Sequence, residues 1–125
     1  MADTLTIGVV GPCAAVKSTL IENLRKAGIP ARHIAQEHSY VQDMWLRLTH
    51  PQVLVYLDVS YPTSKERRKL DWMEAEYREQ CRRLAHAREH ATIYIDTDPL
   101  DACQVFEIVL GELARLVPPG QAKFG

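Results

Sequence analysis

The residues best suited to chemistry form one stretch near the start of the chain, GPCAAVKST at positions 11–19. Phosphate-binding loops have a glycine, four free positions and then Gly-Lys-Ser/Thr, because backbone N–H groups, a helix N-terminus and a lysine must converge on phosphate. Gly11, Lys17 and Ser18 match this pattern, whereas Val16 stands where the second glycine belongs. The stretch therefore predicts a phosphate-binding loop with one departure from the pattern.

Each polar residue of this loop has an expected role. Gly11 would begin the cradle, Lys17 would reach the terminal phosphates, and Ser18 would place its hydroxyl on Mg²⁺. The predicted nucleotide-binding set is the whole loop, with Thr19 at the first phosphate: Gly11, Pro12, Cys13, Ala14, Ala15, Val16, Lys17, Ser18 and Thr19. The alternative is a chance match in a turn between a strand and a helix.

Val16 bears on how well the loop can bind. The glycine of the pattern normally takes a positive φ, which costs a β-branched residue about 1–2 kcal/mol. Loss of one charge-assisted N–H contact would cost about 1.5–3 kcal/mol more. Together these costs predict phosphate binding weakened by roughly two to three orders of magnitude, or a loop of different shape without nucleotide.

The elements around the loop alternate between strand and helix. Apolar runs predict strands at 5–10, around 32–36, at 53–57 and at 92–95, separated or followed by helices at 17–27, from 39, at 64–89 and from 98. Such alternation implies a parallel sheet with right-handed crossovers. We therefore expect an α/β fold, a three-layer α/β/α sandwich with about four parallel strands, as one domain over 1–117 with a disordered tail over 118–125.

Capping residues predict where the later helices begin. Ser39 with Gln42 and Thr63 with Glu66 form capping boxes, and Asp98 precedes a proline at the first helical position. The long helix at 64–89 is expected to bury one stripe, namely Leu70, Met73, Tyr77, Cys81 and Leu84. That stripe could pack on the sheet or on a second copy of the chain.

The loop sequence resembles the G-P-x-x-x-G-K-S-T loop of P-loop nucleoside and nucleotide kinases, including thymidylate-kinase-like proteins. Residues 55–59 (VYLDV), followed by 66–68 (ERR), are similar to the late strand and lid start of these kinases. The resemblance covers most of the chain as architecture and is specific only at the loop. It implies a P-loop NTPase fold, ATP or GTP with Mg²⁺, and transfer of the γ-phosphoryl group to a nucleoside, nucleotide or similar small acceptor.

Four charged residues outside the loop are further candidates. Asp58 ends an apolar strand, as a Walker B aspartate does, and would hold Mg²⁺ through water; a structural role is the alternative. Glu37 follows the second strand, and the resemblance implies a base toward the acceptor hydroxyl. It also implies that Arg67 or Arg68 stabilises the transferring phosphate, although a charged solvent-exposed face would need the same residues. The predicted catalytic set is therefore Lys17, Glu37, Arg67 and Arg68, and Asp58 is a predicted metal ligand.

Composition limits the partners. A net charge of −1 over 125 residues gives no basic footprint for general nucleic-acid binding. The three cysteines form no metal or disulfide pattern, and the first residues lack a signal-peptide pattern, which predicts a cytoplasmic protein without membrane contact. His86 and His90 have a spacing that can bind metal, but no third ligand accompanies them.

These patterns leave two functions open. The first is a small-molecule kinase, with slow NTP hydrolysis as a variant because a chain with little room for a lid admits water. The second is a non-catalytic P-loop domain that binds nucleotide weakly or not at all and serves as a regulatory or assembly module. Val16 and the short chain favour the second, whereas Lys17 to Thr19 favour the first. A GTPase-like switch is disfavoured because the chain lacks an Asn-Lys-x-Asp motif.

Overall fold

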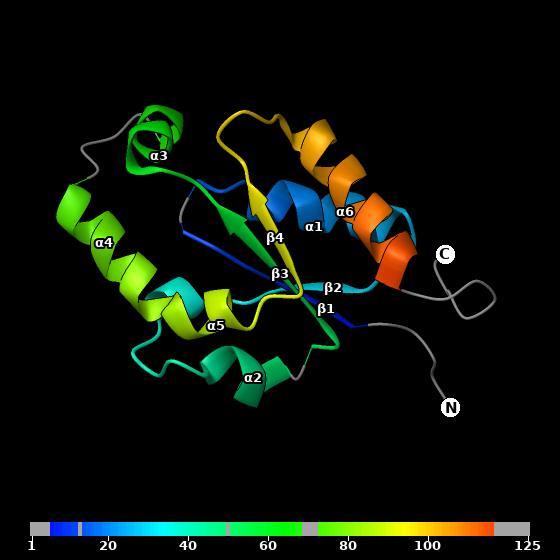
Figure 1. The fold of residues 1–125 in the computed structure, drawn as a ribbon, viewed down its shortest axis with the longest axis horizontal. Helices are drawn as coiled ribbons and strands as arrows, with labels where there is room; N and C mark the ends of the chain where they lie inside the picture. Colours follow the sequence, from blue (N-terminus) through cyan, green and yellow to red (C-terminus); the bar gives the residue numbers. More distant parts are fainter. Residues whose placement is uncertain (1–5, 13, 50, 69–72, 117–125) are drawn as a thin grey trace.

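A computed structural model describes residues 6–12, 14–49, 51–68 and 73–116 (Figure 1). Its centre is a four-stranded sheet in the order β2-β1-β3-β4, in which every neighbouring pair is parallel. The strands are β1 (Ile7–Val10), β2 (Ala31–His33), β3 (Val53–Asp58) and β4 (Ile93–Asp96). The predicted α/β class and parallel sheet are confirmed, and the predicted tail lies outside the described residues.

Helices connect all four strands. They are α1 (Lys17–Lys26), the short 3₁₀ helix η1 (Gln36–His38), α2 (Met44–Thr49), α3 (Tyr61–Arg68), α4 (Glu74–Arg83), α5 (Ala85–Glu89) and α6 (Ala102–Leu116). Among the described residues, none of these helices has the length and apolarity that a bilayer-spanning segment needs.

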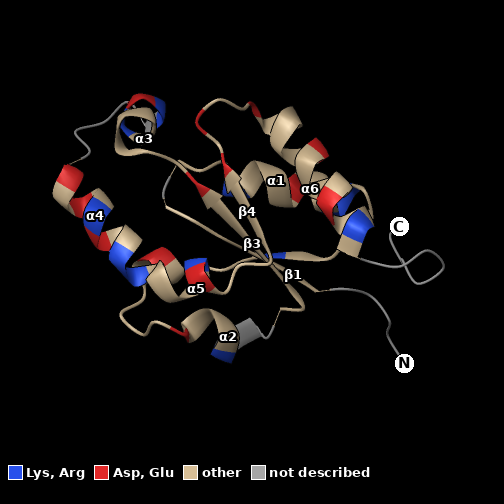
Figure 2. Cartoon of the chain, viewed as in Figure 1, with Lys and Arg blue, Asp and Glu red and all other residues tan. Residues whose placement is uncertain are grey.

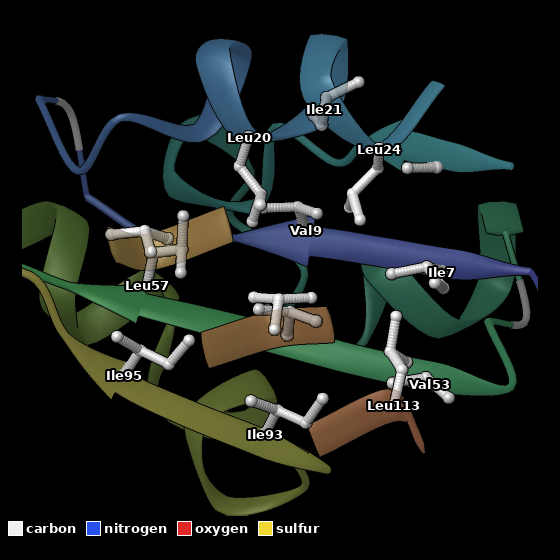
Figure 3. Close-up of a cluster of buried hydrophobic side chains, with 14 of the residues drawn as sticks. Ile7, Val9, Leu20, Ile21, Leu24, Val53, Leu57, Ile93, Ile95 and Leu113 are labelled. Carbon is white, nitrogen blue, oxygen red and sulfur yellow. The ribbon is translucent and has the colours of Figure 1, made fainter. Parts of the chain in front are cut away.

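One face of the sheet packs against α1 and α6, which lie side by side (Figures 1 and 3). Alternate strand residues point to this face, and residues three or four apart on each helix meet them, as the strand and helix periods require. The buried cluster includes Ile7, Val9, Val53, Val55, Leu57, Ile93 and Ile95 from the strands and Leu20, Ile21, Leu24, Val105, Val109 and Leu113 from the helices. One side of each helix, α1 and α6, is therefore buried against the sheet.

The opposite face carries a second buried cluster beneath α2, α4 and α5. It contains Val10, Ile34, Trp45, Leu54, Tyr56, Leu84 and Ala87. Because β3 contributes to both clusters, five of its six residues are buried. Burial on both faces explains the unbroken apolar run from Val53 to Leu57.

The predicted single helix from 64 to 89 is wrong. The structure has α3, α4 and α5 in this segment, and Met73, expected in the buried stripe, is 61% exposed. Met73 has an extended backbone, and Glu76 Oε1 accepts its N–H, so a new helix begins there. Leu70 lies outside the described residues. A stripe at helical spacing does not by itself show whether one helix or several carry it.

Two predicted capping boxes are also wrong. Thr63 lies inside α3, and its N–H bonds to the hydroxyl of Ser60 instead. The Ser39 hydroxyl accepts the N–H of Val41, whereas the Gln42 side chain donates to the Arg82 carbonyl across the fold. Ser39 thus makes a local turn and Gln42 bonds across the fold, so neither caps a helix, and α2 begins at Met44.

Helix α6 also begins later than the sequence pattern predicted. Asp98 accepts the N–H of Ser60 rather than capping the helix. Asp101 and Gln104 form a reciprocal pair of hydrogen bonds, each 2.8 Å, and α6 begins at Ala102. A capping pair is present, therefore, but three residues later than the sequence pattern indicated.

The solvent face of α4 mixes both signs of charge (Figure 2). Residues four apart form ion pairs on it: Arg78 lies 3.1 Å from Glu74, and Arg83 lies 3.0 Å from Glu79. Pairs of this kind contribute little individually because most of these side chains are solvated.

Replacing Leu24 with Ala tests the cluster under α1. Leu24 is fully buried, so we expect the free energy of unfolding to fall by about 2–5 kcal/mol in urea titration. Leu116→Ala is the matched control because that side chain is 46% exposed, and its effect should stay below about 1 kcal/mol. Equal losses in the two variants would contradict this packing.

Candidate functional site

The loop between β1 and α1 follows the carboxyl end of a central strand, where parallel sheets place ligand sites. Gly11 begins this loop in close contact with β3. A Cβ on Gly11 would lie 2.1 Å from the carbonyl oxygen of Leu57, and its φ is +156°. Only glycine fits this position, so packing alone requires the first residue of the phosphate-binding pattern.

Val16 has the positive φ that the pattern implied. Its φ and ψ are 58° and 33°, and Ala14 also has a positive φ of 70°. The Val16 side chain packs against the core cluster, and its carbonyl accepts the N–H of Leu20 at 3.2 Å. Because the free protein already holds the strained conformation, ligand binding need not supply the energy for it.

The N-terminus of α1 is open to an anion. The first N–H groups of a helix have no partner within the helix, and no side chain caps this end. No acidic residue lies in the first turn, and Ser18 and Thr19 are exposed there. The helix dipole adds partial positive charge at the same place.

Lys17 folds back over the loop and is only 7% exposed. Its Nζ donates to the carbonyls of Gly11 at 2.6 Å and Pro12 at 2.9 Å, and lies 3.1 Å from Glu37 Oε2. Three acceptors match the three protons of an ammonium group. The structure thus brings together two of the predicted site residues, Lys17 and Glu37, from different elements.

Glu37 lies in η1, just after β2, and is 2% exposed. Besides Lys17, its Oε2 faces His38 Nε2 at 3.8 Å and His33 Nε2 at 4.0 Å. Its Oε1 is buried and has no hydrogen-bond partner among the described residues. Burial, and then the charge of Lys17, lower the pKa of His33, so this ring favours its neutral form. Lys17 is therefore the close cation that balances Glu37.

Arg67 reaches the loop from α3. Its Nη1 donates to the carbonyl of Ala14 at 2.9 Å and to Thr97 Oγ1 at 3.1 Å, and its Nη2 donates to the Thr97 carbonyl at 2.7 Å. The guanidinium therefore ties the loop to the segment between β4 and α6. Its action on a transferring phosphate stays a prediction, and the side chain of Arg68 lies outside the described residues.

Asp58 lies on the sheet face that α4 and α5 cover. Its Oδ2 accepts the hydroxyl of Tyr94 and lies 3.8 Å from Arg88 Nη2, while its Oδ1 accepts the N–H of Val59 at 2.9 Å. Within the described residues, no contact joins Asp58 to Ser18 of the loop. The predicted role of Asp58 at a metal stays a prediction.

Two hollows accompany these residues. One, of about 630 Å³, runs beside α1 and is lined by Ser18, Thr19, Ile21, Glu22, Arg25, Lys26 and His33. The other, of about 270 Å³, is lined by Tyr56, Asp58, Tyr77, Cys81, Ala85, Arg88 and Glu89. Burial raises the pKa of Tyr56, Tyr77 and Cys81, so these groups are neutral near neutral pH. Sequence reasoning missed the second hollow because its residues are scattered over β3, α4 and α5.

The histidine pair on α5 and its end is engaged in packing. The rings of His86 and His90 stack with centroids 4.2 Å apart, and Trp45 Nε1 donates to His86 Nδ1 at 3.1 Å. Among the described residues, no group of three or more His, Cys, Asp or Glu side chains could hold a metal ion. The spacing of these histidines therefore reflects local packing.

Comparison with known proteins finds no match: no family model matches the chain, and neither a curated protein nor a solved structure is significantly similar to it. The functional interpretation therefore depends on the loop, its geometry and the resemblance of its sequence.

Replacing Gly11 with Ala tests the contact between the loop and β3. The added Cβ would meet the Leu57 carbonyl, so we expect a loss of about 2–4 kcal/mol in the free energy of unfolding. Gly111→Ala on α6 is the matched control: nothing lies within 4 Å of its added Cβ, and the change should stabilise by about 0.5–1 kcal/mol. Denaturant titration of both variants would reveal any departure from these opposite signs.

Proposed function

We propose that this chain is a P-loop nucleotide-binding protein that takes ATP or GTP with Mg²⁺ and transfers the γ-phosphoryl group to a small acceptor. The observation that carries the proposal is Lys17, a buried ammonium held over the loop beside an uncapped helix N-terminus. Burial of a charge is costly unless the charge is paired, and Glu37 with two loop carbonyls keeps this ammonium buried and charged beside the loop.

The loop residues fit the phosphates of a nucleotide. The left-handed residues Ala14 and Val16 turn the backbone toward α1, and successive backbone amides in such turns form anion-binding concavities. Lys17 would exchange the carbonyls of Gly11 and Pro12 for phosphate oxygens. Arg67 would keep Ala14 in place meanwhile, because its guanidinium is anchored on Thr97.

The same residues support phosphoryl transfer. The hydroxyl of Ser18, exposed at the start of α1, would hold Mg²⁺, which would supply positive charge to neutralise the phosphates. Arg25 and Lys26 line the hollow that begins at Ser18, and their charges suit an acceptor that is itself anionic. Phosphoryl transfer depends mainly on positioning and charge, which these residues can supply.

A second function is favoured because acceptor groups of the protein itself already bind the two cations at the loop. Lys17 is engaged by Glu37 and two carbonyls, and Arg67 by the loop and Thr97. A regulatory or assembly module would need only the release of Lys17 on nucleotide binding, without transfer. Acceptor-dependent ADP production with a panel of nucleosides, nucleotides and sugars separates the two: turnover supports the kinase, and nucleotide binding without turnover supports the module.

Calorimetric titration of ATP and GTP with Mg²⁺ tests the nucleotide site. We expect the natural chain to bind, and Val16→Gly to bind less than about tenfold more tightly, because the strain at Val16 is already present in the free protein. The double variant Lys17→Ala/Glu37→Gln should bind about 10–100-fold more weakly than Glu37→Gln alone, since these two variants differ by the one charged contact of Lys17.

The double variant avoids leaving Glu37 buried and unpaired, which would confuse weak binding with unfolding. Arg78→Ala is the control, because its guanidinium lies on α4, outside the loop and both hollows, with a side chain that is 76% exposed. Equal affinity in the double variant and in Glu37→Gln would rule out Lys17 as the phosphate ligand. Absence of binding by both the natural chain and Val16→Gly would overturn the proposed function.

A further inference from the structure

The carboxylate of Glu37 is the most constrained charge in the site. It is 2% exposed, its Oε2 is 3.1 Å from Lys17 Nζ, and its Oε1 is buried without a hydrogen-bond partner among the described residues. A buried carboxylate oxygen without a protein partner is usually bound by water, an ion or a ligand. Glu37 Oε1 is therefore available to accept such a partner.

The charge of Glu37 depends on Lys17. The rings of His33 and His38 lie farther from Glu37 Oε2, at 4.0 Å and 3.8 Å, and their side chains are 42% and 61% exposed. Arg83 donates to the backbone carbonyl of Glu37, not to its carboxylate. If Lys17 turns to a phosphate, a buried carboxylate therefore loses its close cation just as further negative charge arrives. That outcome is strongly unfavourable unless another cation replaces Lys17.

A divalent cation is the natural replacement. Mg²⁺ prefers oxygen ligands and is commonly bound by one or two carboxylates together with substrate phosphates and water. Glu37 Oε1 is a free acceptor, and its neighbour His33 lines the same hollow as Ser18. We propose, on the basis of the nucleotide-binding function above, that Glu37 faces the metal that accompanies the nucleotide and makes nucleotide binding strongly dependent on that metal.

The sequence predicted Asp58, not Glu37, as the carboxylate at the metal. Asp58 does not need a cation to replace Lys17. Its carboxylate bonds to Tyr94 and to the N–H of Val59, with Arg88 nearby, on the face covered by α4 and α5. These partners stay in place when Lys17 moves. The proposal also replaces the role of base that was predicted for Glu37, because a carboxylate that faces a metal is not free to accept the acceptor's proton.

The test is the affinity for ADP, measured calorimetrically with Mg²⁺ and with EDTA, in the natural chain, Glu37→Gln and Asp58→Asn. In the natural chain Mg²⁺ should strengthen ADP binding on the order of 100-fold. In Glu37→Gln the metal effect should fall below about tenfold, and metal-free ADP should bind more tightly than to the natural chain. Asp58→Asn should keep the metal effect of the natural chain.

A second readout follows the metal itself. Electron paramagnetic resonance of Mn²⁺ should show bound Mn²⁺ with ADP in the natural chain and Asp58→Asn, and mostly free Mn²⁺ in Glu37→Gln. Glu37→Asp withdraws the carboxylate without removing its charge, so it should lower the metal effect and leave metal-free affinity unchanged. This variant decides the question if the glutamine variant does not fold.

The outcomes separate the two proposals. An unchanged metal effect in the Glu37 variants, or its loss in Asp58→Asn, overturns the role of Glu37 while nucleotide binding stands. If ADP binds neither to the natural chain nor to Val16→Gly, with or without metal, the proposed function fails and this inference fails with it.

Discussion

The site is organised by one buried ion pair, Lys17 with Glu37. Two charges removed from water are stable together only if each finds further partners, and here Lys17 finds the carbonyls of Gly11 and Pro12. The pair joins the start of α1 to the segment after β2, so it fixes the loop against the sheet edge. All three protons of Lys17 have an acceptor, whereas Oε1 of Glu37 has no hydrogen-bond partner among the described residues.

Much of the fold could be predicted from apolar patterning. The unbroken apolar run at 53–57 is buried on both faces, and α6 buries Val105, Val109 and Leu113, which are spaced four apart. Helix starts were harder, because Gln42 and Asp98 make hydrogen bonds across the fold that their local sequence does not indicate. The break near Met73 was missed for a similar reason, since an apolar stripe continues across it.

Some features of the site could likewise be predicted from local sequence, and others depend on contacts across the fold. The glycine, the lysine and the positive φ at Val16 follow from the loop pattern, because local backbone geometry determines them. The burial of Glu37 and its contact with Lys17 depend on how β2 lies beside β1, which residue types and spacing do not specify. The partners of Asp58 were likewise hidden, because Tyr94 and Arg88 come from β4 and α5.

Arg67 determines how far a disturbance of the loop travels. Its guanidinium joins the carbonyl of Ala14 to Thr97, and so connects the loop to the segment that leads into α6. A shift of Ala14 must either break this strut or carry the start of α6 with it. The thiol of Cys103 is exposed in the first turn of α6, outside the loop. A spectroscopic label on that thiol would therefore report whether a movement of the loop reaches the start of α6.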